Sequence, residues 1–564
     1  VGSNNMDTVS GFVASDVVPD SPTNNFATLN PLEVSSTNDA VLSNGNLIMT
    51  PANAGGWNTR HSTAYMSSGK WYVEYSRVVN SGDVFGGIIQ EGATDANYVG
   101  YGANGYGYHV TGVVQKNASN VATGLATYGT DDVIGIALDM DNGTVQWSKN
   151  GTLQGSALTG LTGAWGFAVS FTVSGTTLGL NFGQDSSFAG NITSGSAGAS
   201  DDNGIGDFFN APPSGFLALA SNNLPDVEII DGTEHFNTVL YTGTGSTQSI
   251  TGVGFGSAPD WVWIKVRNNT NNHRLFDTVR GAGKDLISNS TATESTTTTR
   301  LQSFDSDGFT VGSNAEVNSN GHNIVAWNWL AGTAFSNDAS ATGVGNVDSS
   351  GQVNTTAGFS IVSWQFTTSA DNLIAHQLSS APEMMIIKSR TTAYNWDVYH
   401  TGLSNPATKR ILLNTTGAEI NGFFDTNPTS TVFEYNTSAL SNNDNAIAYC
   451  FHSVEGYSKV GSYIGNGNAD GTYVHLGFRP VFILLRESGN ARNWVISYDH
   501  STYYNGVTQS LFPNISQAED ANTRLDFLSN GFKLRTTSTS WNNNSGNFIY
   551  YAIGDQPAKF SNAR

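Results

Sequence analysis

Short runs of alternating apolar and polar residues, separated by turn-forming residues, recur along most of this chain. The clearest run enters a turn at Asp141-Asn142-Gly143 through Val133, Ile136 and Leu138, leaves it through Val145 and Trp147, and meets a second turn at Asn150-Gly151. Because Asn-Gly adopts the positive φ angles of a tight hairpin, this pattern predicts two paired strands.

Runs of the same kind continue from about Leu42 to Asn223. They predict strands at Lys70–Tyr75, Val84–Ile89, Tyr106–Val110, Ile134–Leu138 and Trp165–Phe171. Short strands with turns at this density are typical of a β-sandwich. Residues 1–35 are polar and carry three prolines, so we expect an extended lead-in there and a sandwich over residues 36–226.

Several motifs in this region occur in the order found in SPRY domains. They are Gly69-Lys-Trp-Tyr-Val-Glu-Tyr75, Gly86-Gly-Ile88, Tyr106-Gly-Tyr108, Asp132-Val-Ile-Gly-Ile136, Asp139-Met-Asp141, Lys149-Asn-Gly151 and Gly179-Leu-Asn-Phe-Gly183. The region therefore resembles the SPRY family. The resemblance implies a concanavalin-like sandwich of two antiparallel sheets whose loops at one end serve binding, and it implies no catalysis.

The rest of the chain contains an internal repeat. The segments Ala258-Pro-Asp-Trp-Val-Trp-Ile-Lys265, Ala381-Pro-Glu-Met-Met-Ile-Ile-Lys388 and Arg479-Pro-Val-Phe-Ile-Leu-Leu-Arg486 match one another. Trp396 and Trp494 each lie 14 residues after their proline, where the first copy has His273. Each copy ends in an apolar strand, at Asn323–Trp329, Asn445–Phe451 and Asn547–Ile553. The repeat predicts three β units at 227–340, 341–456 and 457–564.

The shared proline has a physical reason, because proline can start a strand where its missing N–H costs nothing. The whole pattern predicts an all-β chain, with a concanavalin-like SPRY sandwich followed by three tandem sandwich-like repeat units.

This combination also resembles uncharacterised proteins of marine bacteriophages, through the segment Asp20-Ser-Pro-Thr-Asn-Asn-Phe-Ala-Thr-Leu-Asn30 as well as the repeats. The resemblance implies a virion-associated location, as a tail fibre or a decoration of the particle. The chain starts at Val1 with no signal-like segment, and we expect a parent with more sequence before it.

Composition excludes some partners. The net charge is −21 and only 12% of residues are charged, which argues against nucleic acid because phosphate backbones need clustered Lys and Arg. No run of about 18 apolar residues occurs, so we expect no membrane span. The only cysteine, Cys450, lies in an apolar run and is expected to be a buried small hydrophobe.

Motifs that suggest cofactors are each explained better by turns. Gly100-Tyr-Gly-Ala-Asn-Gly105 fits the dinucleotide pattern, but a strand follows where a helix is needed. Gly281-Ala-Gly-Lys-Asp285 lacks the full phosphate-loop spacing. The calcium-like openings at Asp139–Gly143, Asp305–Gly308 and Asn466–Gly471 lack the terminal glutamate or specify no ligand set. We therefore expect no cofactor, although the acidic loops leave a calcium role open.

Two histidines follow repeat tryptophans and have aspartates nearby. His400 accompanies Asp397, and His500 accompanies Asp499, so an acid–base pair could be imagined. Both recur at the same position of the repeat, and structural units repeat their packing whereas active sites rarely come in serial copies. We therefore predict packing roles for both histidines. Neither a Gly-x-Ser-x-Gly nor a His-Glu-x-x-His motif occurs, and paired carboxylates for glycoside cleavage cannot be identified from sequence.

Aromatic residues in Gly- and Asn-rich segments are the candidate binding residues: Trp57, Tyr98, Tyr101, Tyr106 and Tyr108. Tyrosine and tryptophan dock sugar faces and form protein hot spots. We expect a non-enzymatic protein of a virion or extracellular surface that associates with itself or with other surface proteins and binds a host-surface glycan or protein. The alternatives are a self-polymerising filament or coat subunit and a polysaccharide-degrading tail protein.

Overall fold

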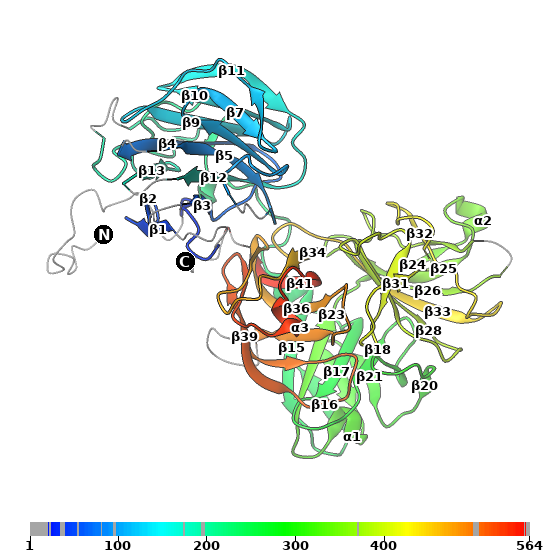
Figure 1. Ribbon diagram of the computed structural model, residues 1–564. Helices are drawn as coiled ribbons and strands as arrows, with labels where there is room; N and C mark the ends of the chain where they lie inside the picture. The colour runs from blue at the N-terminus through cyan, green and yellow to red at the C-terminus, as the bar shows by residue number, and fades with distance from the viewer. Residues whose placement is uncertain are drawn as a thin grey trace. The chain divides into compact units, whose positions relative to one another are not determined.

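A computed structural model describes residues 21, 24–33, 40–52, 56–79, 82–93, 97–172, 175–192, 198–368, 371–422, 424–499, 507–557 and 559 of the 564. The chain divides into two compact units, Val1–Asp226 and Val227–Arg564 (Figure 1). Strands dominate both, which confirms the all-β prediction. Most of the expected lead-in lies outside the described residues. No helix within the described ranges is long and apolar enough to cross a membrane.

The first unit is a sandwich of two sheets that are antiparallel except where β14 pairs with β4 in parallel. One sheet has the order β1-β2-β13-β4-β9-β10-β11, with β14 beside β4, and the other has the order β3-β12-β5-β6-β7-β8. Their bounds are β1 Ala40–Ser43, β2 Ile48–Pro51, β3 Asn58–His61, β4 Lys70–Val79, β5 Val84–Gln90, β6 Gly105–His109, β7 Val113–Lys116, β8 Ser119–Ala122, β9 Val133–Asp139, β10 Thr144–Lys149, β11 Thr152–Thr159, β12 Trp165–Phe171, β13 Thr177–Asn181 and β14 Leu217–Ala218.

The hairpin expected from the sequence is β9–β10. Asp139 pairs with Thr144, so the chain reverses over residues 140–143, and Gly143 has φ 61° as the turn requires. The Asp139 carboxylate accepts hydrogen bonds from the Asn142 backbone and side chain at 3.0 and 2.8 Å and pairs with Lys70 at 3.0 Å. These bonds stabilise the turn. The hairpin therefore explains the residues that resemble the start of a calcium-binding loop.

The second unit contains three modules, each built on one main antiparallel sheet. The strand orders are β15-β23-β17-β18-β19-β20 in the first module, β24-β25-β26-β33-β28-β29-β30-β31 in the second, and β34-β41-β36-β37-β38-β39-β40-β35 in the third. Two smaller sheets, β16-β22-β21 and β27-β32, accompany the first two modules.

The bounds in the second unit follow. They are η3 Ser221–Asn223 just before the unit, η4 Gly232–Glu234, β15 Phe236–Thr242, β16 Gln248–Thr251, β17 Trp261–Val266, β18 Arg274–Asp277, β19 Lys284–Ile287, β20 Ser295–Thr296, β21 Leu301–Asp305, β22 Gly308–Val311, α1 Ala315–Asn318, β23 Asn323–Trp329, β24 Thr333–Asn337, α2 Ala339–Thr342, β25 Ser349–Asn354, β26 Phe359–Gln365, β27 Leu373–Ala375, β28 Met384–Ser389, β29 Asp397–His400, β30 Lys409–Leu412, β31 Ile420–Asn421, β32 Val432–Glu434, β33 Asn445–Phe451, β34 Ser458–Ile464, β35 Tyr473–His475, β36 Phe478–Glu487, β37 Val495–Tyr498, β38 Val507–Leu511, β39 Asp520–Leu528, β40 Gly531–Leu534, α3 Thr539–Asn542 and β41 Asn547–Pro557.

The repeat seen in the sequence matches these modules closely. The predicted terminal strands are β23, β33 and β41, and each lies beside the strand that follows a repeat proline. Two details differ. β24 pairs with β25, so the second module begins before residue 341. Pro480 lies inside β36 at a register shift, where a missing N–H is tolerated, rather than before the strand.

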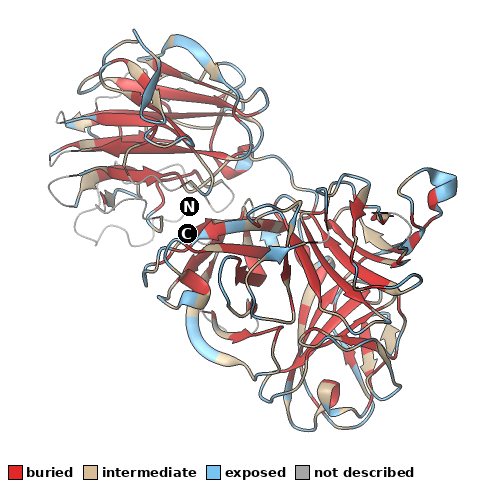
Figure 2. Ribbon diagram, turned by 45° about the vertical axis from the view of Figure 1, so that its right-hand side comes forward, coloured by how far each residue is buried: buried red, intermediate tan, exposed pale blue. Residues whose placement is uncertain are grey.

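Each main sheet buries both of its faces. On β17, Trp261 and Trp263 enter a core shared by all three modules, whereas Val262 and Ile264 enter a core of the first module alone. The same alternation occurs on β28 and β36. Figure 2 shows the burial along these strands. Because side chains alternate across a strand, the continuous apolar runs after the prolines follow from burial on two faces.

Aromatic contacts close the three modules into a ring around the shared core. Trp261 of the first module stacks on Tyr449 of the second, with ring centroids 4.2 Å apart. Phe451 of the second contacts Tyr551 of the third at 4.6 Å. Tyr498 of the third meets Trp327 of the first edge-on at 5.4 Å. The first and last modules are therefore neighbours.

Hydrogen bonds join the modules at each junction, and two of these junctions repeat the same bond. The Trp396 indole donates to the Ile287 carbonyl at 2.9 Å, from the second module to the first. The Trp494 indole donates to the Leu412 carbonyl at 2.9 Å, from the third to the second. His273 stands where the other copies have tryptophan, and at this junction the Ser288 hydroxyl of the first module donates to the Pro513 carbonyl of the third at 2.7 Å. The repeat thus encodes a closed ring of three.

Candidate functional site

Three of the predicted binding aromatics lie together on the first unit, outside the sheet that contains β5 and β6. Tyr98 stacks on Phe85 of β5 with centroids 4.2 Å apart and planes 14° apart. Trp57 packs against Tyr98 at 4.5 Å, and Tyr101 meets Tyr98 edge-on at 5.5 Å. Tyr101 is 45% exposed, and Trp57 and Tyr98 are half-buried. We call Trp57, Phe85, Tyr98 and Tyr101 the aromatic face.

The loop that carries Tyr98 and Tyr101 is fixed to the sheet below it. The Thr59 hydroxyl donates to the Asn97 carbonyl at 2.7 Å, and the Val99 N–H donates to the Ser170 hydroxyl at 3.0 Å. Gly107 permits this approach, since a Cβ there would lie 2.0 Å from the Val99 carbonyl oxygen. Gly100 has φ 96°, a conformation that favours glycine. Gly100 of the dinucleotide-like motif therefore serves a packed loop of the sandwich.

Polar groups border the aromatic face. The Tyr98 hydroxyl donates to the Gln115 side chain at 2.9 Å, and Gln115 donates to Asn120 at 2.9 Å. On the Phe85 side, His109 lies 3.2 Å from the Asp83 carboxylate. Burial lowers the pKa of His109, although Asp83 opposes that shift.

The structure corrects two of the predicted binding residues. Tyr106 and Tyr108 lie on strand β6 and are only 7% and 0% exposed. The Tyr108 hydroxyl bonds to the Ala126 carbonyl, and the Lys116 ammonium lies 4.3 Å from the Tyr106 ring centroid. Because both residues have the same parity on the strand, both point into the sandwich. Phe85 and His109, which the sequence reasoning missed, have the opposite parity, and alternation along the strands was the available signal.

The acidic turns have local partners. Asp305 accepts from the hydroxyls of Ser303 and Thr310, each at 2.7 Å, and Asp470 pairs with Lys533 at 2.9 Å. Within the described ranges, no group of three or more His, Cys, Asp and Glu side chains is placed to hold a metal ion.

His400 and Asp397 do not form an acid–base pair. His400 is buried at the junction of the second and third modules, with Nε2 3.0 Å from the Tyr550 carbonyl oxygen and Nδ1 accepting from the Gly402 N–H at 2.9 Å. Asp397 instead accepts from Arg410 at 2.5 Å and from the Tyr435 hydroxyl at 2.6 Å.

The supposed equivalence of His400 and His500 is also wrong. His400 pairs with Met384 and Tyr498 pairs with Phe482, two residues after each repeat proline, so Tyr498 is the counterpart of His400. His500 itself lies outside the described residues, and Asp499 is 3.4 Å from Arg479.

Comparison with protein families separates the two units. A family model described as SPRY domain matches residues 70–185, which confirms the SPRY resemblance. A model described as Domain of unknown function (DUF7483) matches residues 231–557, more than half of the chain. The chain belongs to the DUF7483 family. We refer to the first unit as the SPRY domain and to residues 227–564 as the DUF7483 region.

Solved SPRY structures are similar to part of this chain at low identity. The SPRY domain of human HERC1 is 20% identical, covering 27% of this chain and 96% of that chain, with a TM-score of 0.24. The TRIM65 PSpry domain is 16% identical, covering 28% and 89%, with a TM-score of 0.23. A comparison with curated proteins finds no match.

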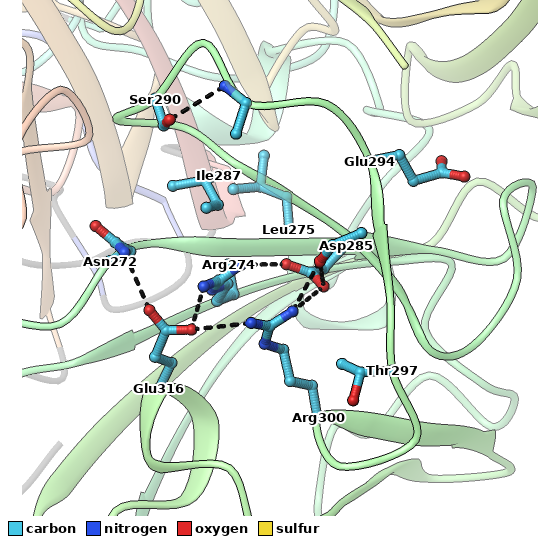
Figure 3. Close-up of polar contacts among 12 residues, drawn as sticks. Asn272, Arg274, Leu275, Asp285, Ile287, Ser290, Glu294, Thr297, Arg300 and Glu316 are labelled. Carbon is cyan, nitrogen blue, oxygen red and sulfur yellow. Dashed lines mark hydrogen bonds and ion pairs between the residues drawn. The ribbon is translucent and has the colours of Figure 1, made fainter. Parts of the chain in front are cut away.

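A four-membered charge network occupies the first module of the DUF7483 region (Figure 3). Arg274 and Arg300 both bind the buried Asp285, at 2.5 and 2.6 Å, and both also pair with Glu316 of α1. Asn272 donates to the other oxygen of Glu316 at 3.0 Å. The two positive and two negative groups balance one another in charge, and the network anchors α1 to the sheet.

The second module of the DUF7483 region reverses this polarity. The register places Asp397 where the first module has Arg274, and Arg410 where it has Asp285. The third module has Val495 and Ser510 at the matching positions. A pair that can be inverted or replaced by an apolar residue serves packing, because a reacting centre needs a fixed charge arrangement.

Proposed function

We propose that this chain is a non-enzymatic recognition and assembly protein of a virion or another extracellular surface. The SPRY domain binds the partner, a surface glycan or protein, through the aromatic face. The DUF7483 region serves as a rigid carrier. The observation that supports recognition is the clustering of Trp57, Tyr98 and Tyr101 over a loop that is already packed in place. Preorganised Trp and Tyr side chains bind partners with little loss of conformational entropy.

The assembly role and the location rest on different support. The DUF7483 region buries the two faces of its main sheets and closes on itself, which makes a stiff body suited to carrying a binding domain. The resemblance to marine bacteriophage proteins is the reason for proposing the virion as the location. Immunogold labelling of intact particles tests this location, and label confined to the soluble fraction would count against it.

Recognition is tested by screening the purified full chain against arrayed glycans and surface proteins, beside the Tyr101→Ala and Leu153→Ala variants. Leu153 is a matched control because it is 51% exposed and lies on β11, in the other sheet of the SPRY domain. We expect partners that bind the parent and Leu153→Ala but not Tyr101→Ala. If no bound partner distinguishes the two variants, the proposed role of the aromatic face is wrong.

The two alternatives have their own tests. Regular filaments in electron micrographs of the purified chain would favour the self-polymerising subunit. New reducing or unsaturated ends after incubation with polysaccharides would favour the degrading enzyme.

A further inference from the structure

The aromatic face offers ring surfaces in three different orientations. The Trp57 plane is tilted by 48° from Tyr98, and the Tyr101 plane by 74°, while Phe85 covers one side of Tyr98. A single flat side chain of a peptide packs against one ring surface. Consecutive sugar rings can instead place their C–H surfaces against several aromatic rings of different orientation. The geometry therefore suits an extended ligand with repeated apolar patches.

The border of the face supplies groups that match hydroxyls. Gln115 and the exposed Asn120 carry amides, which both donate and accept, and Thr111 is an exposed hydroxyl beside His109, 2.7 Å from its Nδ1. The Asp83 carboxylate is 58% exposed and accepts only. A sugar hydroxyl also donates and accepts, so such a set recognises it without a charge on the ligand.

The cations near the face are directed away from it. The Lys116 ammonium donates to the Tyr106 hydroxyl at 2.7 Å, on the opposite side of β7 from Gln115. Arg77 is buried and donates to the Gly82 carbonyl at 3.0 Å. Carboxylate or sulfate groups are normally bound by Arg or Lys, and Asp83 would repel them.

We propose that the aromatic face binds an uncharged glycan, with sugar rings against Trp57 and Tyr101 and sugar hydroxyls bonded to Gln115, Asn120 and Asp83. This inference rests on the proposed recognition role and specifies its ligand class. Acidic polysaccharides and peptides are excluded as the ligand of this face.

The test is isothermal titration of the full chain with a panel of neutral polysaccharides (dextran, mannan, laminarin and galactomannan) and acidic ones (alginate and heparin). We expect binding to at least one neutral polymer and weaker or undetectable binding to the acidic ones. Trp57→Ala and Tyr101→Ala should each weaken neutral binding about tenfold or more, which corresponds to about 1.4 kcal/mol. Leu153→Ala should bind as the parent does.

Asp83→Lys provides a second, independent readout. It removes the repulsion and adds a cation, so acidic polymers should gain affinity severalfold relative to neutral ones. Unchanged circular dichroism of each variant shows that folding is intact.

The outcomes separate the two proposals. No binding to any neutral polymer, or equal binding by Tyr101→Ala, overturns the glycan assignment. If a protein partner is lost in Tyr101→Ala while every glycan fails, recognition by this face stands and only the ligand class is wrong. If neither kind of partner depends on Trp57 or Tyr101, both proposals fail.

Discussion

The SPRY domain and the DUF7483 region both consist of antiparallel sheets, but they complete their cores differently. In the SPRY domain, two sheets enclose one large core drawn from within residues 27–219. In the DUF7483 region, each main sheet fills its own outer core and also contributes to a core that needs all three modules. The first architecture is complete in one domain, whereas a single DUF7483 module is not.

Removing the third module should have the largest effect. A DUF7483 region ended after residue 456 would expose Trp327 and Phe451, which contact the third module, as well as the rest of the shared core. Since apolar burial is the main stabilising contribution, we expect no cooperative unfolding transition in this fragment. Circular dichroism during heating measures it.

The SPRY fragment 21–226 is the matched comparison, and we expect it to unfold cooperatively by itself. A cooperative transition in residues 227–456 would show that two modules suffice and would refute the need for a closed ring.

Single tryptophans should separate the two cores. Trp261→Ala in the shared core and Trp147→Ala in the SPRY core should each cost about 3–5 kcal/mol of unfolding free energy, because both side chains are buried. Each variant should lower only the transition of its own region. We also expect Trp261→Ala to leave a single transition for all three modules. Calorimetry that resolves separate module transitions would contradict a shared core.

The sequence predicted much of this architecture because its signals are local. Asn-Gly turns, proline-led apolar strands and the position 14 residues after each proline all reappear in the structure. Ring closure had no such signal, because its contacts join residues such as Arg267 and Glu519, which are 252 positions apart. The candidate site was predicted only in part, because the burial of its side chains also depends on contacts between distant parts of the chain. Aromatic content and alternation along β6 were visible, but which face of β6 is buried depends on how its sheet packs against the other sheet.

Lowering the pH should change the stability of the two regions in opposite directions. Burial lowers the pKa of His400 in the DUF7483 region to about 4, below its usual 6.5. Its contribution to stability is therefore complete above pH 6.5 and is lost as pH falls towards 4. Burial raises the pKa of Glu74 in the SPRY domain to about 7, above its usual 4.5. That contribution is complete below pH 4.5 and is lost as pH rises through 7.

When the pH falls from 7 to 5, protonation of His400 should lower the unfolding free energy of the DUF7483 region by about 2 kcal/mol. Protonation of Glu74 should raise the unfolding free energy of the SPRY domain by about 2 kcal/mol over the same range. Urea unfolding at the two pH values, in the parent and in His400→Gln and Glu74→Gln, measures each contribution. Each variant should reduce the pH dependence of its own region by about this amount and leave that of the other region unchanged. A His400→Gln variant that keeps the full slope would show that another group is responsible.

The smallest expected effect concerns the unequal junctions of the ring. The Glu519 backbone N–H donates to the Arg267 carbonyl at 2.7 Å, and their side chains pair at 3.0 Å. The next junction repeats this with Glu294 and Arg390, at 2.9 Å for both contacts. At the third junction, the Glu419 N–H donates to the Ser488 carbonyl at 2.8 Å, but serine cannot form the ion pair.

Arg267→Ser would place serine at the junction with Glu519, as Ser488 stands at the junction with Glu419. We expect a loss of about 1.5–3 kcal/mol, because a charge-assisted bond is broken and Glu519 keeps only part of its partners. Ser488→Arg at the third junction should gain no more than about 1 kcal/mol, since Glu419 is already bonded to Ser404. Denaturant unfolding of both variants measures the difference. Equal and opposite changes in unfolding free energy would mean that the junctions are interchangeable. The expected asymmetry means that each junction is packed around its own side chains. The ring is then threefold in its backbone only.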